Sequence, residues 1–284
     1  ILNIAVFRKE TLYQKMRALI IYLVISAVFI GCTPILSIDA STQSVYHFSD
    51  TDKNISLLDI SETFGTYDGS FVLYDNNLDS WKIYDLEEAT KRIPPESTYK
   101  IYDALLGLES GIITPEHSSM TWNGDAFPFP SWEADQDLNS AMQNSVNWYF
   151  QAIDSQLGIN RVQEFLNKIE YGNQTTSSNL DLYWSDFSLK ISPLEQVTLL
   201  KKFNTNEFHL NSQNVFSVKN AIKIASTPNG NFYGKTGTGR VNGQDINGWF
   251  IGYVETPDNS YYFATNIQSD SNATGKKAFE ITSD

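Results

Sequence analysis

An uncharged, mostly aliphatic run from Ala18 to Leu36 is the dominant apolar segment at the start of the chain. It is long enough to cross a bilayer. Four basic residues precede the run, whereas Asp39 follows it. Because positive charge favours the cytoplasmic side, we expect residues 1–17 inside, one membrane helix over 18–37 and the remainder outside. The four basic residues are Arg8, Lys9, Lys15 and Arg17.

A cleaved signal peptide is the alternative interpretation of this run. Phe29-Ile30-Gly31-Cys32 has a faint likeness to a lipoprotein cleavage box, which would place a lipid on Cys32. Phe is unusual at the first position of such a box, so a retained span in the plasma membrane is favoured. Polar residues after the run predict a linker over 38–54 and a folded domain over 55–284. We expect the chain to be a fragment of a longer protein.

Short runs in which apolar and polar residues alternate predict strands at both ends of this domain. The early runs, 69–75 and 80–85, are separated by Asn76-Asn77, which predicts a hairpin. The late runs cover 232–235, 247–254 and 260–266. The turns expected among the late strands are Gly237-Thr238-Gly239, Asn242-Gly243 and Pro257-Asp258-Asn259.

Apolar spacings of three and four residues predict helices in the middle of the domain. They cover 97–108, 138–157, 161–169 and 193–203, and the residues 276–281 begin to look helical. A loop rich in Pro, Gly and aromatic residues is expected over 116–137. Strands at both ends with helices between them predict an α+β fold, in which an antiparallel sheet is flanked by helices.

Composition excludes several classes of function. The net charge of −13 argues against nucleic acid as a partner, because phosphate binding needs concentrated Lys and Arg. A single cysteine, Cys32, excludes an internal disulfide and a cysteine-based metal site. The histidines His47, His117 and His209 lack metal-ligand spacing, so no metal is expected.

The segment from Pro94 to Lys100 predicts the start of a helix that carries chemistry. The prolines cannot continue an earlier helix, so we expect the helix to begin at Ser97, with Ser or Thr as its cap. Ser97 and Lys100 then lie one turn apart on one face, where the amine reaches the hydroxyl. This is the arrangement of a serine nucleophile with a lysine base. Ser-x-x-Lys occurs about once by chance in a chain of this length, so a capped helix with a solvated lysine stays open as the alternative.

Lys235-Thr236-Gly237 is a rarer pattern. It lies where a predicted strand passes into a turn, which would expose Lys235, Thr236 and Thr238 to a cleft. A cation with hydroxyl groups suits a bound carboxylate, whereas a glycine-containing hairpin without a ligand is the other interpretation. Ser145-Val146-Asn147 lies on the predicted middle helix. Ser-x-Asn is a weak pattern, but only this copy precedes an amphipathic aromatic run.

Taken together, these motifs resemble the penicillin-recognising serine enzymes. Tyr171-Gly172-Asn173 with Trp249-Phe250-Ile251-Gly252 is similar to the class D β-lactamase branch. Within that branch the chain resembles the extracellular sensor domain of the β-lactam-sensing membrane transducers, the Bla/Mec receptor family. That family joins the sensor to a cytoplasmic zinc metallopeptidase, and residues 1–29 resemble the end of the peptidase portion and the last span by position only. The similarity runs from about Ile55 to the end.

The resemblance implies roles for the motif residues. Ser97 would attack the β-lactam carbonyl, with Lys100 as general base and Ser145 relaying the proton. The backbone N–H groups of Ser97 and Thr238 would form the oxyanion hole. The drug carboxylate would be held by the strand residues Lys235, Thr236, Gly237 and Thr238.

Trp184 matches the tryptophan that, in class D enzymes, hydrogen-bonds a CO2 adduct on the motif lysine. A tryptophan packed in the core is the other interpretation. The resemblance thus implies a CO2 adduct on Lys100 in the free state and no other cofactor.

Asn147 distinguishes a receptor from an enzyme. Class D β-lactamases usually have an apolar residue here, which favours a neutral lysine that takes up CO2. The amide of Asn147 would instead hydrogen-bond Lys100 and favour loss of the adduct once Ser97 is acylated. We therefore expect a β-lactam receptor whose covalent adduct persists and signals across the membrane.

Three other functions remain open at this point. A membrane-tethered class D β-lactamase is the main alternative. Whether the protein is an enzyme stays open, because we expect it to be acylated like a class D β-lactamase but to deacylate very slowly. A peptidoglycan transpeptidase is disfavoured by Tyr171-Gly172-Asn173. A non-catalytic binding domain would lack one of the nucleophilic residues, and none is missing.

Overall fold

The computed structural model describes residues 54–181 and 183–284. The predicted segments 1–17 and 18–37, and residues 38–53 of the predicted linker, lie outside the described residues. Among the helices that are described, none combines the length and apolar character needed to cross a bilayer.

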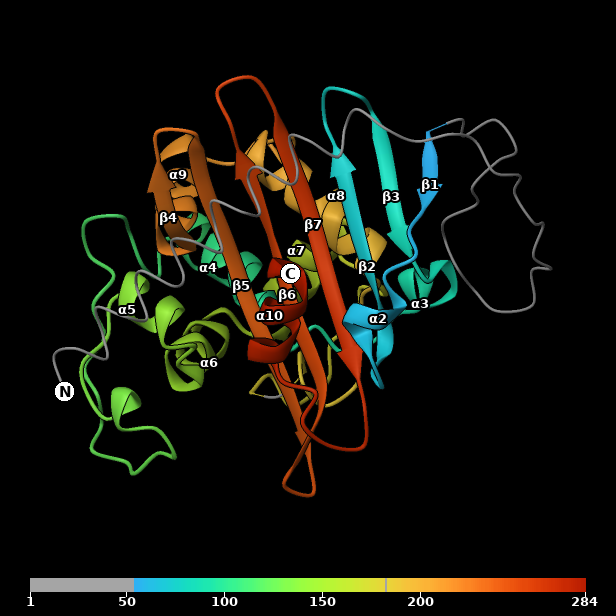
Figure 1. Ribbon diagram of the computed structural model, residues 1–284. Helices are drawn as coiled ribbons and strands as arrows, with labels where there is room; N and C mark the ends of the chain where they lie inside the picture. The colour runs from blue at the N-terminus through green and yellow to red at the C-terminus, as the bar shows by residue number, and fades with distance from the viewer. Residues whose placement is uncertain (1–53, 182) are drawn as a thin grey trace, which may run out of the picture.

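One seven-stranded sheet lies at the centre of the described part (Figure 1). The strand order is β1-β3-β2-β7-β6-β5-β4, and only β1 with β3 is a parallel pair. Because β2 pairs with β7, the opening strands extend a sheet that the last strands build. The strands are β1 (Ile55–Leu57), β2 (Asp68–Asp75), β3 (Ser80–Tyr84), β4 (Lys223–Thr227), β5 (Gly230–Val241), β6 (Gln244–Glu255) and β7 (Ser260–Gln268).

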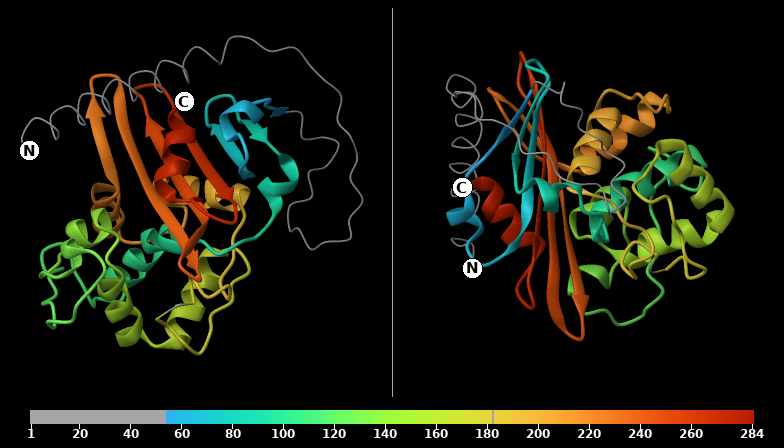
Figure 2. Two further views of the ribbon diagram at one scale, coloured as in Figure 1. Left: turned by 60° about the horizontal axis from the view of Figure 1, so that its bottom comes forward. Right: turned by 90° about the vertical axis from the view of Figure 1, so that its right-hand side faces the viewer.

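Helices cover both faces of this sheet (Figure 2). The helices α2 (Ser61–Phe64) and α10 (Gly275–Ser283) pack on one face, over a small core that includes Phe64, Phe250 and Ala278. The larger core lies between the other face and the central helices. The remaining helices are α3 (Leu86–Thr90), α4 (Lys100–Glu109), α5 (Leu138–Gln143), α6 (Asn147–Leu157), α7 (Ile159–Ile169), α8 (Pro193–Asn204) and α9 (Ser212–Ala221), with the 3-10 turns η2 (Glu96–Tyr99) and η3 (Pro130–Trp132).

Most of the predicted elements are confirmed. The α+β class, the early hairpin, the turns at Asn242-Gly243 and Pro257-Asp258-Asn259 and the helices α7 and α8 all lie where the pattern predicted them. Helix α8 begins with a capping box, in which Ser192 accepts from the N–H of Glu195 and the Glu195 carboxylate accepts from the N–H of Ser192. The helices α2, α3 and α9 and the strands β1 and β4 were not predicted.

The predicted helix over 138–157 is two helices. It breaks between α5 and α6, so the motif Ser145-Val146-Asn147 lies at a turn and not on a continuous helix. Ser145 has a left-handed φ of 55°, and Asn147 is the first residue of α6. Met142, Val146 and Tyr149 all enter the same core, so the apolar spacing continues through the break and hides it.

The predicted turn at Gly237-Thr238-Gly239 is wrong, because β5 continues through it, and its pairing with β6 shifts register only after Gly239. The glycines serve close packing instead. A Cβ on Gly237 would lie 3.2 Å from the Ser97 nitrogen, and a Cβ on Gly239 would lie 2.3 Å from a carboxylate oxygen of Glu96. Glycine inside a strand is typical of such a close approach.

Candidate active site

Ser97 lies on η2, the 3-10 turn that leads into α4. The predicted α-helix start at Ser97 is therefore wrong by one turn, and the Ser97 side chain caps nothing. Its hydroxyl oxygen instead accepts a hydrogen bond of 2.7 Å from Nζ of Lys100. The two side chains lie together because three residues separate them on consecutive helical turns.

The backbone before Ser97 is fixed by side chains from distant elements. Nδ2 of Asn247 and Nε1 of Trp249, both on β6, donate to the carbonyl of Pro94 at 3.0 and 2.8 Å. The hydroxyl of Thr98 donates to the carbonyl of Pro95 at 2.6 Å. These bonds hold the candidate nucleophile on a rigid support.

Lys100 is completely buried, and its Nζ also donates to Oδ1 of Asn147 at 2.6 Å. Burial lowers the pKa of Lys100 well below its ordinary value, and the positive charge of Lys235 lowers it further. Asp103 and Glu96 oppose part of this shift. A lowered pKa increases the share of the neutral amine at a given pH, and the neutral amine is the form that accepts a proton from a serine.

A second lysine and serine form a parallel pair. Nζ of Lys235 donates to Oγ of Ser145 at 2.9 Å and to the carbonyl of Thr236 at 2.9 Å. Burial lowers the pKa of Lys235 to about 7, so its charge changes near neutral pH. Ser145 lies in the turn between α5 and α6, and from there its hydroxyl reaches Lys235 on β5.

The expectation that Lys235, Thr236 and Thr238 all face one cleft is wrong. Lys235 is only 5% exposed. Alternate residues of a strand point to opposite faces, and Gly237 faces η2 as Lys235 does. Thr236 and Thr238 lie on the α10 side, where the Thr238 hydroxyl accepts from the N–H of Gly275 at 2.9 Å.

The backbone of Thr238 nevertheless reaches the site. The N–H of Gly234 donates to the carbonyl of Ile222, so Gly234 directs its N–H away from β6. In an antiparallel pair every second residue does the same, which turns the N–H of Thr238 to the open edge of β5. Because Gly237 has no side chain, the backbone nitrogen of Ser97 lies close to β5 at this point. Two such N–H groups are the donors an oxyanion needs.

Trp184 lies beside the lysine, as the resemblance implied, with its ring centre 5.9 Å from Nζ of Lys100. The ring of Phe150 is 5.7 Å from the same atom. The motif Tyr171-Gly172-Asn173 does not line the site. The Tyr171 ring packs edge-on against the ring of Tyr99, with 5.2 Å between their centres, and so supports η2.

Sequence reasoning missed Glu96, which directly precedes Ser97. It has a left-handed φ of 52°, and its Oε1 accepts from Nδ2 of Asn247 at 3.1 Å. Burial raises the pKa of Glu96 to about 8, although the bond from Asn247 and the charge of Lys100 lower it in part. No local pattern marks this residue, because its partners come from β5 and β6.

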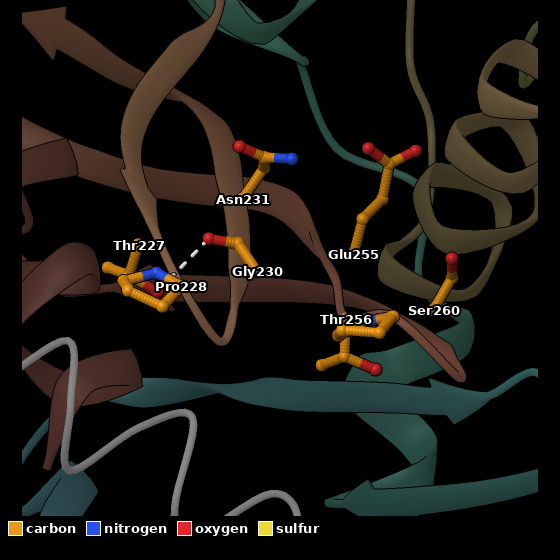
Figure 3. A pocket seen from close by; sticks show the side chains of 8 residues that line it. Thr227, Pro228, Gly230, Asn231, Glu255, Thr256 and Ser260 are labelled. Atoms are coloured by element: carbon orange, nitrogen blue, oxygen red, sulfur yellow. Dashed lines mark hydrogen bonds between the residues drawn. The ribbon is translucent and has the colours of Figure 1, made fainter.

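A separate hollow lies where β4 and β5 join and where β6 meets β7 (Figure 3). Its lining includes Thr227, Asn231, Glu255 and Ser260 and contains none of the residues described above. Glu255 is paired with Lys219 at 3.0 Å, so its charge is already compensated.

Comparison with known proteins places this chain in a family. Residues 65–284 match the model of the penicillin binding protein transpeptidase domain. The regulatory protein BlaR1 of Bacillus licheniformis is 44% identical over 272 residues, which are 95% of this chain and 45% of that protein. The chain thus spans less than half the length of this relative.

Two solved structures are similar to the described part. The C-terminal domain of the Bacillus licheniformis BlaR penicillin-receptor has a TM-score of 0.78 and 46% identity, covering 81% of this chain and 94% of that one. A class D β-lactamase from Bacillus subtilis has a TM-score of 0.74 and 35% identity, covering 79% of this chain and 92% of that one.

Proposed function

The chain belongs to the penicillin-binding protein transpeptidase domain family, in the group that includes the BlaR penicillin-receptor and the class D β-lactamases, and we propose that it is the sensor part of a β-lactam receptor. Higher identity to the receptor domain than to the class D enzyme supports this assignment. The reaction is acylation of Ser97 by the antibiotic.

Acylation uses the two lysine–serine pairs in turn. Oγ of Ser97 attacks the lactam carbonyl carbon while its proton passes to the neutral amine of Lys100. The N–H groups of Ser97 and Thr238 stabilise the negative oxygen. The ring C–N bond then breaks, and Ser145 gives its hydroxyl proton to the ring nitrogen and takes up in exchange the proton held by Lys100, which returns to the neutral amine. Lys235 lies at 2.9 Å from Ser145 and is the cation for the drug carboxylate.

The hydrogen bond of 2.6 Å from Lys100 to Asn147 is the observation that carries the proposal. Deacylation needs a base that activates water, and an amide oxygen is not a base. By accepting an N–H of Lys100, Asn147 directs the amine away from that task. Loss of a general base slows a step by about 10²–10⁴-fold, so the acyl adduct persists.

The CO2 adduct on Lys100 remains part of the proposal. The residues around the amine fit it in part, since a lowered lysine pKa and the apolar rings of Phe150 and Trp184 favour a neutral amine. Bound CO2 would supply a carboxylate base. The amide oxygen of Asn147 faces the same amine and disfavours that added charge.

We also propose that residues 18–37 span the plasma membrane and that the domain from residue 55 onward is extracellular. The signal would pass through the span to a cytoplasmic metallopeptidase portion of the same protein. The charge bias on either side of the apolar run supports this orientation.

A chromogenic cephalosporin mixed with the purified 284-residue chain tests the proposal. We expect a burst of about one equivalent followed by very slow turnover, because Ser97 is acylated and not regenerated. Ser97→Ala should abolish the burst. Sustained turnover would contradict the receptor and favour the class D β-lactamase, a second candidate supported by the complete set of nucleophile, base and oxyanion donors. Absence of any burst would indicate a binding domain.

A further inference from the structure

A row of three amide side chains crosses the sheet toward the nucleophile. Asn247 lies on β6, and Asn266 and Gln268 lie on β7. Nδ2 of Asn266 donates to Oδ1 of Asn247 at 2.9 Å, and Nε2 of Gln268 donates to Oδ1 of Asn266 at 3.2 Å. Asn247 is paired with Gln268 and Asn266 with Trp249, so the three amides lie on the same face of the sheet as Trp249.

The row ends at the residues just before the nucleophile. Nδ2 of Asn247 donates to Oε1 of Glu96 at 3.1 Å and to the carbonyl of Pro94 at 3.0 Å. Each amide of the row thus donates in the direction of the turn η2, and the last N–H groups find their acceptors there. At the other end, Nε2 of Gln268 also donates to Oε2 of Glu88 on α3 at 3.3 Å.

The row is buried where it approaches the turn. Asn247 is 6% exposed and Asn266 is 2% exposed. A buried amide loses its hydrogen bonds to water, so it is costly unless protein groups replace them. Apolar side chains could fill the same space without this requirement. A hydrogen bond depends on distance and direction, so the row specifies the position of the turn more closely than apolar packing would.

Glu96 needs such a support. Its φ of 52° is left-handed, which is unfavourable for a residue with a Cβ. Its N–H donates to the carbonyl of Trp184 at 3.1 Å, and its carboxyl group accepts from Asn247. Gly239 has no side chain, and a Cβ there would collide with the Glu96 carboxyl group. Because Ser97 follows directly, any change in the backbone angles of Glu96 moves the nucleophile.

We propose that the amide row of Asn247, Asn266 and Gln268 is a positioning device for Ser97, which acts through Glu96. The members of the row are positioning residues, because they bond to the turn and not to the reacting atoms. They hold the turn so that the nucleophilic hydroxyl stays at the motif lysine and its backbone stays beside β5. This inference rests on the proposed function, because it takes Ser97 as the residue that the antibiotic acylates.

Three substitutions in the 284-residue chain remove parts of the row. Asn247→Ala removes both bonds to the turn. Asn266→Ala leaves those bonds in place but removes the donor that orients the Asn247 amide. Glu96→Met keeps a side chain of similar length but offers only a thioether, which is a weak acceptor. If Asn247→Ala does not fold, the other two substitutions still test the row.

Two matched variants serve as comparisons. Glu96→Gln keeps an acceptor oxygen at the same place. Burial raises the pKa of Glu96 to about 8, although the bond from Asn247 and the charge of Lys100 lower it in part, so the carboxyl group is mostly neutral at pH 7, as the Gln amide is. Gln244→Ala removes an exposed amide from the same strand as Asn247.

Stopped-flow measurements with a chromogenic cephalosporin at several concentrations separate the dissociation constant of the first complex from the rate constant of acylation. Asn247→Ala should lower the rate constant by about 10–100-fold, and Asn266→Ala and Glu96→Met by about 3–30-fold, through misplacement of Ser97. The dissociation constant should change by about twofold or less, because Lys235 keeps its place beside Ser145. Glu96→Gln should retain most of the parental rate constant, and Gln244→Ala all of it.

A double variant tests whether Asn247 and Glu96 act through one bond. When Asn247→Ala is combined with Glu96→Met, acylation should be no slower than in Asn247→Ala alone, because both changes remove the same hydrogen bond. A loss equal to the product of the two single losses would contradict a shared role. Circular dichroism and the melting temperature show whether each variant is folded.

Other kinetic results decide against the proposal. A parental rate constant in both Asn247→Ala and Asn266→Ala would overturn it. Equal losses in Glu96→Gln and Glu96→Met would mean that the accepted hydrogen bond has no part in positioning. A weaker first complex with an unchanged rate constant would assign the row to drug binding instead.

A measurement without drug separates this inference from the proposed function. In protein with glutamate labelled by carbon-13, the Cα and Cβ chemical shifts of Glu96 report its left-handed backbone, and Glu96→Gln assigns the signals. These shifts should change in Asn247→Ala and Asn266→Ala but not in Gln244→Ala. Unchanged shifts in both of the first two variants would refute the row as a support of the turn. A parent chain that is not acylated would instead refute the proposed function, whatever the shifts show.

Discussion

At the scale of single residues, the site is organised around the amine of Lys100. Its Nζ donates to Ser97 at 2.7 Å and to Asn147 at 2.6 Å, inside a completely buried environment. Under the proposed function, the first contact supports acylation and the second withholds the amine from hydrolysis, so that Lys100 would favour capture of the drug over its release.

Replacing Asn147 by Val tests this division of roles. Val cannot accept an N–H from Lys100, so the amine becomes available to a deacylating water. We expect the adduct to hydrolyse faster by about 10²–10⁴-fold. A carbamate signal on labelled lysine should also appear in the acyl state. Mass spectrometry of the adduct over time measures the lifetime.

Asn144→Ala is the control for this change, because within the described part of the chain the Asn144 side-chain amide bonds to the carbonyl of Ser140 in the preceding helix and not to Lys100. Its adduct should last as long as in the parent. If Asn147→Val also keeps the parental lifetime, our account of Asn147 is wrong.

At the scale of elements, the site depends on two departures from regular packing. The break between α5 and α6 directs Ser145 to Lys235, and the glycines of β5 let η2 lie against the strand. The helix break positions the Ser145 hydroxyl, and the glycines, which have no side chain, position the backbone of η2. Small changes in these elements should therefore affect chemistry more than stability.

Gly237→Ala tests the contact between β5 and η2. The new Cβ would lie 3.1 to 3.2 Å from atoms of Pro95, Glu96 and Ser97, so the turn must shift by a few tenths of an ångström. We expect acylation to slow by about 10–100-fold through misplacement of the oxyanion donors. Stopped-flow measurement of the burst rate tests this. Val241→Ala, a change at an exposed position on the same strand, should leave the rate unchanged, and an equal effect of both would refute the argument.

At the scale of the whole molecule, the first and last strands share one sheet. β2 pairs with β7 along its full length, so the two ends of the domain are joined at the centre of the sheet. The site is formed by residues of η2, α6 and β5, of which β5 is a strand of that sheet and α6 belongs to the helices that cover one of its faces (Figure 2). The domain should therefore lose its sheet and its site together.

Ile267→Ala tests this unity. Ile267 is 0% exposed on β7 and pairs with Gly69 on β2. Removing most of its side chain should lower the free energy of unfolding by about 2–5 kcal/mol. Urea unfolding followed by circular dichroism and by tryptophan fluorescence should give coincident transitions. Leu57→Ala, at a position 65% exposed, should cost about 0.5 kcal/mol or less, and separate transitions in either variant would contradict a single unit.

Local patterns identified the fold class and most of the site. Period-two and period-four spacings reflect burial on one face, so they predicted the strands, α7 and α8. The order of Ser97, Ser145 and Lys235 along the chain carried the family resemblance. The α5–α6 break was missed because the residues on both sides of it enter one core, and apolar spacing records burial, not backbone direction.

The sequence by itself determined which chemical groups are present: a serine with a lysine one turn away, a second serine and lysine, and an amide at Asn147. Only the tertiary structure decided how they meet, since Asn147 of α6 bonds to Lys100 and Lys235 of β5 bonds to Ser145. Asn247 of β6 likewise bonds to Glu96, the residue before the nucleophile. The tertiary structure also turned Thr236 and Thr238 to the far face of β5. Hydrogen bonds and pKa values depend on distances of a few ångströms and on burial, which no local pattern of residues records.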